Sequence, residues 1–363
     1  MKFVTLVGNR PQFVKAAAVS RRLRERHSEL LVHSGQHYDD ELSAVFFREL
    51  DLPSPDRQLA VGSGADGEQI ARIMHSFEPV LREADPDMVI VYGDTNTTLA
   101  GALTTSGAGL PLAHVEAGMR SGDWEMPEER NRVLTDHVSA LCLCSTETAL
   151  ENLARESAPG VAELVGDVMA DVSIAMAPVA ERDSSVLEQL RIEPGRYLLM
   201  TVHRAGNVDT EESIRQLVEL LRDLPATTVF PVHPRTHAAL ERFGALDTLK
   251  ALEHLRLVPP LGYLDFLKLL LHARVVLTDS GGVQKEAYLA RVPCLTLRDT
   301  TEWTETVELG WNTLVGLDPQ RVLGALDRVE RPASHPDLYG GGRAGEAIVD
   351  ALGRFHGANR DGL

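Results

Sequence analysis

Three carboxylates in the first half of the chain follow apolar runs that are typical of buried strands. Asp94 comes one glycine after the run Met88–Tyr92. Glu116 directly follows Leu112–Val115, and Glu128 lies in the segment beyond it. Carboxylates that gather in one place raise one another's pKa values, so a set of them can divide the acid and base roles of a proton transfer. The pattern predicts a proton-transfer site at the ends of neighbouring strands.

Structural roles compete with chemistry at these positions. Asp94 opens a helical segment and could simply cap it. The other carboxylates could form salt bridges, and we expect such a pairing for Glu129. The arginines available for it are Arg120, Arg130 and Arg132.

Cationic residues also follow predicted strands. Arg10 and Lys15 lie near the start of the first helical segment, where free N–H groups favour an anion. His203, Arg204 and His233 end two strands of the second half. A histidine there could be structural, or an acid or base near neutral pH. These residues predict a cationic rim that binds a diphosphate; solvated surface charges are the alternative.

A strand, a Ser-Gly-Gly turn and a helix form the last pattern. Ser280, Gly281 and Gly282 would let the backbone approach a pyrophosphate at a helix N-terminus. Glu286, one helical turn further on, could accept both hydroxyls of a ribose, or could be a first-turn glutamate favoured by the helix dipole. Together with the carboxylates, this pattern indicates chemistry at a carbon atom of a nucleotide-linked sugar.

Other motifs argue against metals and cofactors. The turn after the first strand lacks the G-x-G-x-x-G fingerprint and the Walker pattern, and no H-E-x-x-H occurs. Cys142 and Cys144 are separated by one residue in an apolar run, which favours strand packing over a metal site. We therefore expect neither a metal nor an organic cofactor.

The elements that position these residues alternate between strands and helices. Continuous apolar runs indicate parallel strands covered by helices on both faces, with ligands beyond the carboxyl ends of the strands. We expect an α/β protein with two doubly wound, Rossmann-like domains facing a central cleft. Residues 1–168 would carry the carboxylates and residues 169–363 would bind the nucleotide, with a join near Val165–Ser184 and a terminal helix that could pack back on the first domain. The predicted strands are Phe3–Val7, Leu30–Ser34, Met88–Tyr92, Leu112–Val115, Leu141–Cys144, Tyr197–Val202, Thr228–Val232, Leu255–Val258, Val275–Thr278 and Cys294–Leu297.

The composition is that of an acidic globular protein. The chain has 363 residues, of which 44% are hydrophobic and 25% charged, and its formal net charge is −17. The length is typical of two domains at about 150 residues each. The negative charge argues against binding to nucleic acids or anionic membranes. A short first apolar run, no long apolar stretch and only three cysteines favour a cytoplasmic location.

The order of these motifs resembles the non-hydrolysing UDP-N-acetylglucosamine 2-epimerases, which have a glycosyltransferase-B-type fold. The similarity covers nearly the whole chain. The landmarks that carry it are Gly8-Asn9-Arg10-Pro11, Gln36-His37, Gly93-Asp94-Thr95, His114-Val115-Glu116-Ala117-Gly118, Pro127-Glu128-Glu129, His203-Arg204, Pro231-Val232-His233 and Asp279-Ser280-Gly281-Gly282.

The resemblance implies interconversion of UDP-GlcNAc and UDP-ManNAc. In that family UDP is eliminated as the C2 proton leaves, and it adds back to a bound 2-acetamidoglucal after reprotonation on the other face. Asp94, Glu116 and Glu128 match the family's acidic catalytic positions, and His203 matches its active-site histidine. Which carboxylate removes the proton and which returns it stays open.

The resemblance also implies binding roles and an assembly. Arg10 and Lys15 match contacts with the diphosphate and sugar, and Glu286 matches the ribose ligand. In bacterial members a second UDP-GlcNAc activates the enzyme through a Gln-His segment, here Gln36-His37. The family further implies a UDP-sugar substrate, a homodimer and a product used for surface polysaccharide. Its phosphate loop corresponds to Ser280, Gly281 and Gly282.

Two departures from the family pattern affect the second half. The family often has a glutamate two residues after His-Arg, where this chain has Gly206. It often reads Thr-Glu-Arg-Pro-Glu, where this chain has Trp303 at the arginine position. These differences bear on the sugar preference.

Three other functions are compatible with parts of the pattern. A hydrolysing relative would release free ManNAc and UDP with the same carboxylates. A glycosyltransferase of the same architecture would need an acceptor groove, and the carboxylate cluster speaks against it. A UDP-sugar-binding regulator without turnover would not need Asp94, Glu116 and Glu128 intact.

Overall fold

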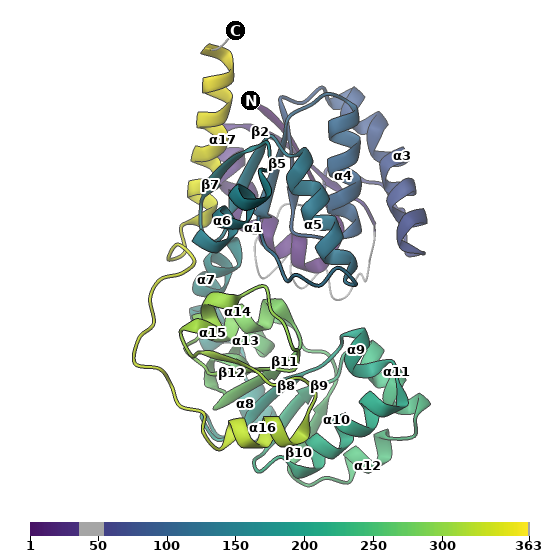
Figure 1. The fold of residues 1–363 in the computed structure, drawn as a ribbon, viewed down its shortest axis with the longest axis vertical. Coiled ribbons are helices and arrows are strands. Elements are labelled where there is room, and N and C mark those ends of the chain that lie inside the picture. Colours follow the sequence, from purple (N-terminus) through teal and green to yellow (C-terminus); the bar gives the residue numbers. More distant parts are fainter. Residues whose placement is uncertain (36–53, 362–363) are drawn as a thin grey trace. The chain divides into compact units, whose positions relative to one another are not determined.

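The computed structural model describes residues 1–35 and 54–361, and the chain divides into two units. Unit 1 comprises Met1–Ala175 and Asp337–Leu363, and unit 2 comprises Met176–Pro336. Each unit is built on its own parallel sheet with helices on both faces (Figure 1). The predicted α/β class with two Rossmann-like folds is confirmed. In the described part of the chain, no helix is long and apolar enough to span a membrane.

Unit 1 is organised around a seven-stranded sheet. Its strands are β1 (Lys2–Val7), β2 (Ser28–His33), β3 (Arg57–Gln58), β4 (Met88–Tyr92), β5 (Leu112–Ala117), β6 (Leu141–Cys144) and β7 (Val161–Leu164). They are parallel and lie in the order β3-β2-β1-β4-β5-β6-β7. The order reverses between β1 and β4, which is where doubly wound sheets bind ligands beyond their strand ends.

The helices of unit 1 bury two apolar clusters, one on each face of the sheet. They are α1 (Arg10–Arg26), α3 (Asp66–Ala84), α4 (Asn96–Gly107), α5 (Pro127–Val138), α6 (Glu147–Glu156), α7 (Val168–Asp183) and α17 (Ala344–Asp361). Side chains of α1 and α17 pack into one cluster, and side chains of α3 and α4 pack into the other. The segment Val165–Ser184, expected to join the domains, is mostly α7, and the two units divide within that helix.

Unit 2 repeats this plan with a six-stranded parallel sheet. Its strands are β8 (Leu198–Thr201), β9 (Thr228–Pro231), β10 (Leu255–Val258), β11 (Val275–Thr278), β12 (Cys294–Thr296) and β13 (Asn312–Leu314). They lie in the order β10-β9-β8-β11-β12-β13, with the reversal between β8 and β11. The segments that follow β8 and β11 therefore begin where a doubly wound sheet is expected to bind its ligand, beyond the carboxyl ends of the strands.

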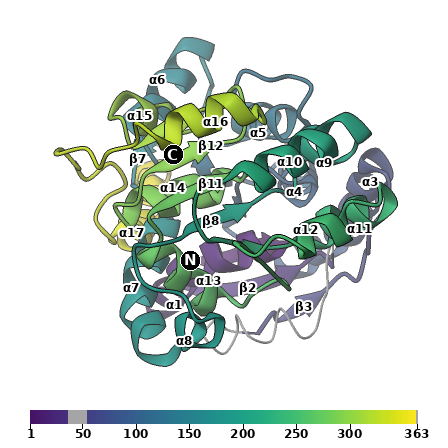
Figure 2. The ribbon, with the colours of Figure 1, turned by 90° about the horizontal axis from the view of Figure 1, so that it is seen from below.

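Helices cover both faces of the unit 2 sheet as well. They are α8 (Val186–Leu190), α9 (Ala205–Val208), α10 (Glu211–Asp223), α11 (Pro234–Arg242), α12 (Leu246–Lys250), α13 (Tyr263–His272), α14 (Gly281–Leu289), α15 (Thr304–Glu308) and α16 (Pro319–Leu326). Figure 2 shows α10 and α16 on one side of the sheet and α8 and α13 on the other. Each pair contributes to a separate apolar cluster, so the sheet is buried on both faces.

Four predicted strands have the observed bounds, and three observed strands were not predicted. The matches are Met88–Tyr92, Leu141–Cys144, Leu255–Val258 and Val275–Thr278. The unpredicted strands are β3, β7 and β13, all of which lie at sheet edges. Two of them are short and β7 is mostly exposed. Edge strands of this kind lack the continuous apolar run that marks a buried strand.

The terminal helix α17 packs on α1 and belongs to unit 1. Its first turn is held by Asp171, which accepts hydrogen bonds from the backbone N–H groups of Ala344 at 2.9 Å and Gly345 at 2.8 Å. Gly345 has no Cβ, which lets α17 approach the α1 backbone at Ala18.

The thiols are expected to be inert in the folded protein. Cys142 and Cys144 are buried in β6, as the strand-packing interpretation predicts, and Cys294 is buried in β12. Burial raises the pKa of Cys144 and of Cys294 to about 12 and that of Cys142 further. Because the thiolate is the reactive form, a disulfide reagent at pH 8 should modify the native protein at least about 100-fold more slowly than the protein in guanidinium. Rapid labelling of the native protein would contradict this burial.

Candidate active site

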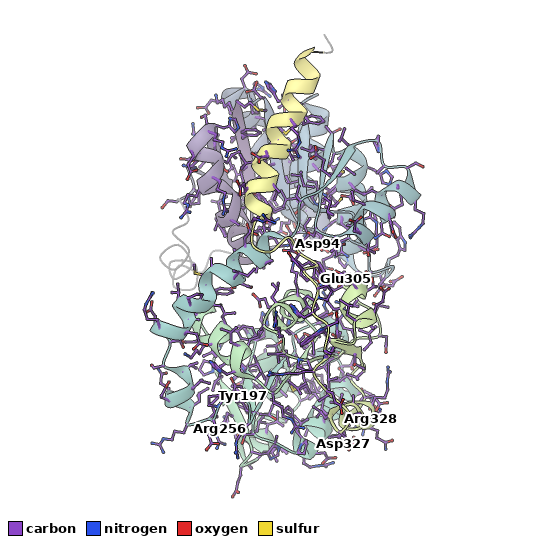
Figure 3. All side chains as sticks on the ribbon, turned by 90° about the vertical axis from the view of Figure 1, so that its left-hand side faces the viewer. Asp94, Tyr197, Arg256, Glu305, Asp327 and Arg328 are labelled. Carbon is purple, nitrogen blue, oxygen red and sulfur yellow. The ribbon has the colours of Figure 1, made fainter. Side chains whose placement is uncertain are left out.

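Asp94 and Glu116 lie at the carboxyl ends of two neighbouring strands of the unit 1 sheet. Asp94 (labelled in Figure 3) follows β4 after Gly93, and Glu116 lies near the end of β5, the parallel neighbour of β4. Glu128 occupies the first turn of α5, where its side chain is half-buried. The same helix is bound to Asp94, because Asn131 donates to the Asp94 carbonyl at 3.0 Å. The three predicted carboxylates therefore lie just after β4 (Asp94), in β5 (Glu116) and in α5, the helix that follows β5 (Glu128).

Glu116 has an unusual backbone and a cationic partner. Its φ of +72° lies in the left-handed region, and the pairing register of β5 shifts between Val115 and Ala117. A bulge of this kind re-aims a side chain, and strained non-glycine residues concentrate at functional sites. The carboxylate forms an ion pair with Lys15 of α1, and the two side chains are only 11% and 14% exposed. The structure therefore brings Lys15 to a catalytic candidate.

Asp94 does not cap the following helix. Thr95 is the N-cap of α4 and forms a capping box with Thr98, so the capping alternative for Asp94 is wrong. The Asp94 carboxylate instead forms an ion pair with buried Arg132. Arg132 also binds Glu129 at 2.9 Å, which confirms the salt bridge expected for that glutamate.

The first helix begins where the sequence predicts an anion site. Asn9 caps α1 and Arg10 is its first residue. Gly8 is required before the cap, since an added Cβ would lie within 2.8 Å of neighbouring side-chain atoms. Gln36 and His37, predicted for a second ligand site, lie outside the described residues.

Gln12 is a buried residue of α1 that the sequence pattern did not mark as a site candidate. Its side-chain oxygen accepts the N–H of Gly8 at 2.7 Å, and its amide nitrogen donates to the carbonyl of Tyr92 at 2.7 Å and to Thr98 at 2.8 Å. These bonds join the turn after β1 to the end of β4, next to Asp94. The available signal was a polar side chain in the first turn of a helix that directly follows a buried strand.

Asp279 organises the candidate site of unit 2 and was also missed as a site residue. Its buried carboxylate accepts the backbone N–H groups of His203 at 2.9 Å and Arg204 at 2.8 Å, and the amide of Asn207 at 3.1 Å. Its other oxygen lies 3.0 Å from Nδ1 of His203. Burial alone would raise the pKa of Asp279, but the hydrogen bonds and charge of His203 and its backbone donors lower it overall. The carboxylate therefore fixes the orientation of the His203 ring.

His233 lies beside His203, with ring centroids 5.3 Å apart. It is the N-cap of α11, and its Nδ1 accepts the N–H of Arg235 at 3.2 Å. Partial desolvation of the ring lowers the pKa of His233, and the neighbouring His203 lowers it further. The turns that carry His203 and His233 thus come together at the carboxyl ends of β8 and β9.

The Ser-Gly-Gly turn begins α14. Ser280 is the N-cap and makes no side-chain cap hydrogen bond, and Gly281 is the first helical residue. An added Cβ on Gly281 would lie 3.4 Å from Nε1 of Trp303. Trp303 is thus against the predicted phosphate loop, and Lys285 Nζ lies 4.1 Å from the centre of its ring. Glu286 is buried one turn along the same helix, and the second departure, Gly206, is exposed in α9.

Comparison with known proteins identifies the family. Residues 21–353 match the profile of the family described as UDP-N-acetylglucosamine 2-epimerase. The chain belongs to this family. The UDP-N-acetylglucosamine 2-epimerase homolog of Methanococcus maripaludis is 44% identical over 355 residues, covering 97% of this chain and 99% of that protein. The UDP-2,3-diacetamido-2,3-dideoxy-D-glucuronate 2-epimerase of Pseudomonas aeruginosa is 41% identical over 365 residues, covering 98% of this chain and all of that protein.

A solved structure of this epimerase family has the same fold. The crystal structure of Methanocaldococcus jannaschii UDP-GlcNAc 2-epimerase in complex with UDP-GlcNAc and UDP matches with a TM-score of 0.91 and 40% identity. The match covers 98% of this epimerase-family chain and 100% of the other. The predicted membership of the family and the predicted fold class are confirmed.

Proposed function

We propose that this epimerase is non-hydrolysing and interconverts UDP-GlcNAc and UDP-ManNAc. The observation that carries the proposal is that Asp94 and Glu116 lie at neighbouring strand ends of unit 1. Each of the two carboxylates forms an ion pair with a cationic side chain. The UDP-GlcNAc in the M. jannaschii epimerase supports the choice of substrate. The family resemblance supports a cofactor-free homodimer whose product enters surface polysaccharide.

The unit 1 carboxylates would move the proton at C2 of the sugar. One carboxylate removes it, the electron pair of the broken C–H bond forms a C1–C2 double bond, and the C1–oxygen bond to UDP breaks. The products of this step are 2-acetamidoglucal and UDP. A second carboxylate returns a proton to the opposite face as UDP adds back. Asp94, Glu116 and Glu128 are the candidates for these acid and base roles.

The residues of unit 2 would hold the UDP. No carbonyl is adjacent to C2, so loss of the proton depends on the departure of the diphosphate. Cations and helix N-termini stabilise the charge that develops on it. His203, Arg204 and the Ser280–Gly282 loop are the candidates for that role, and Glu286 is the candidate ribose ligand.

A second substrate is favoured by one specific observation. The P. aeruginosa relative, named for UDP-2,3-diacetamido-2,3-dideoxy-D-glucuronate, is as similar to this chain as the M. jannaschii epimerase is, at 41% and 40% identity. Trp303, which departs from the usual arginine, lies against the phosphate loop and could alter selectivity. We therefore propose this diacetamido uronate as the alternative substrate.

Both substrates can be tested in D₂O by proton and phosphorus NMR. With the purified protein we expect the 2-epimer to form from UDP-GlcNAc, with deuterium at C2 and the UDP linkage intact. Preferential turnover of the diacetamido uronate would support the alternative substrate.

The other outcomes decide between the remaining functions. Free ManNAc and UDP would show a hydrolysing enzyme. Binding of both UDP-sugars without exchange at C2 would support a regulator and would contradict the proposed reaction. Transfer of the sugar to an added acceptor would support a glycosyltransferase.

A further inference from the structure

His114 and Asp136 form a buried pair behind the carboxylates of unit 1. Nδ1 of His114 lies 2.7 Å from Oδ1 of Asp136, and neither side chain has exposed surface. A carboxylate accepts hydrogen bonds, so the ring nitrogen donates. Burial of such a pair is costly unless its remaining polar atoms are also bonded. The partners of those atoms therefore show what the pair holds in place.

His114 holds the peptide that precedes Asp94. Its Nε2 lies 2.7 Å from the carbonyl oxygen of Gly93 and donates to it, because a carbonyl can only accept. Gly93 has a φ of +63°, and an added Cβ there would lie 3.0 Å from Nζ of Lys15 and 3.6 Å from Oε2 of Glu116. His114 thus holds the Gly93–Asp94 peptide. This peptide begins the turn that carries Asp94, and its Gly93 end lies directly against the Lys15–Glu116 ion pair.

Asp136 holds the turn that follows Glu116. Its Oδ2 accepts the backbone N–H of Gly118 at 3.1 Å and the guanidinium of Arg120 at 2.8 Å. Burial alone would raise the pKa of Asp136, but the charges and hydrogen bonds of His114 and Arg120 lower it overall, so the carboxylate stays charged. One carboxylate thus ties the chain just beyond Glu116 to the histidine that fixes Gly93.

We propose that His114 and Asp136 act as one positioning unit that sets the relative placement of the Asp94 and Glu116 carboxylates for proton transfer. The inference rests on the proposed function of these two carboxylates. Glu116 keeps its left-handed backbone only because surrounding contacts over-determine it. A shift of about 1 Å in a reacting group can reduce a rate by about 100-fold, so loosening either end of this unit should affect chemistry more than binding.

The test compares His114→Gln, Asp136→Asn and the double variant with the parent protein. The readouts are kcat and KM for UDP-GlcNAc, exchange at C2 in D₂O and Kd for UDP. We expect kcat and exchange to fall by about 10- to 100-fold, while KM and the Kd for UDP stay close to the parent's values. Because the two residues act together, the double variant should lose little more than the worse single variant.

Asp171→Asn is the matched control for the loss of stability that replacing a buried, hydrogen-bonded carboxylate causes. Asp171 is a buried carboxylate of unit 1 that holds the first turn of α17. We expect this variant to lower Tm by an amount similar to the test variants while kcat stays at the parent value. A lower Tm with unchanged kcat in His114→Gln and Asp136→Asn would overturn the inference, since the pair would then be merely structural.

A crystal structure of His114→Gln separates this inference from the proposed function. We expect the Gly93 carbonyl to rotate and Glu116 to move relative to Lys15. Superposition of Asp94 and Glu116 on their parent positions would overturn the positioning role for any substrate. Failure of the parent protein to exchange C2 of either UDP-sugar would overturn the proposed function alone.

Discussion

Replacement of Glu116 by glutamine is expected to reduce kcat for epimerisation by about 10²- to 10⁴-fold, the usual contribution of a positioned acid or base. Glutamine has the same shape, and its side-chain oxygen can still accept a hydrogen bond from Lys15, so the fold should persist. It cannot take up a proton near neutral pH. The measurements are kcat and C2 exchange with UDP-GlcNAc in D₂O, with Kd for UDP as the binding readout.

The Kd for UDP should stay close to the parent value, because most of the residues proposed to bind UDP belong to unit 2 and the glutamine oxygen still accepts a hydrogen bond from Lys15. Glu78→Gln is the control, since Glu78 is an exposed carboxylate on α3 that pairs across one helical turn with Arg82. It should retain parent activity. Near-parent turnover by Glu116→Gln would remove Glu116 from the catalytic set and leave Asp94 and Glu128.

Replacement of Asp279 by asparagine should have the largest effect within unit 2. The amide oxygen can still accept the backbone N–H groups of His203 and Arg204. The amide nitrogen then faces Nδ1 of His203, which has to become an acceptor, so the ring proton moves to Nε2. Inversion of the tautomer and loss of the negative charge beside the ring should reduce kcat/KM by about 100-fold or more. Steady-state kinetics with UDP-GlcNAc measures this loss.

The same variant has a predicted effect on the pH dependence of stability. The pKa of Asp279 is lower in the folded protein than its ordinary value, so its contribution is present above about pH 4 and is lost as the pH falls through the folded pKa. The parent should exceed Asp279→Asn in free energy of unfolding by about 1–3 kcal/mol at pH 7, with a smaller difference in acid. Asp223→Asn, at an exposed pair with Arg222, is the control and should show little change. A constant difference from pH 7 to pH 3 would contradict the lowered pKa.

The sequence alone determined the family, the fold class and the places where functional residues begin. Continuous apolar runs are a local signal, so buried strands such as Met88–Tyr92 and Val275–Thr278 could be predicted with their bounds. The residues that follow such strands could be predicted as site candidates, because parallel strands end at a common edge. Short exposed edge strands such as β7 carry no such signal and were missed.

The tertiary structure decided how each candidate residue is held. Lys15 and Glu116 are 101 residues apart in the chain, and His203 and Asp279 are 76 residues apart. No local pattern predicts that Asp94 pairs with Arg132 rather than capping α4, or that His114 ties Gly93 to Asp136. These contacts form because neighbouring parallel strands bring their ends together and because buried charges must find partners among whatever side chains that pairing supplies. Local periodicity shows which residues are buried and whether they form a helix or a strand. The partner of each charged side chain, in contrast, depends on sheet order and helix packing across the whole unit.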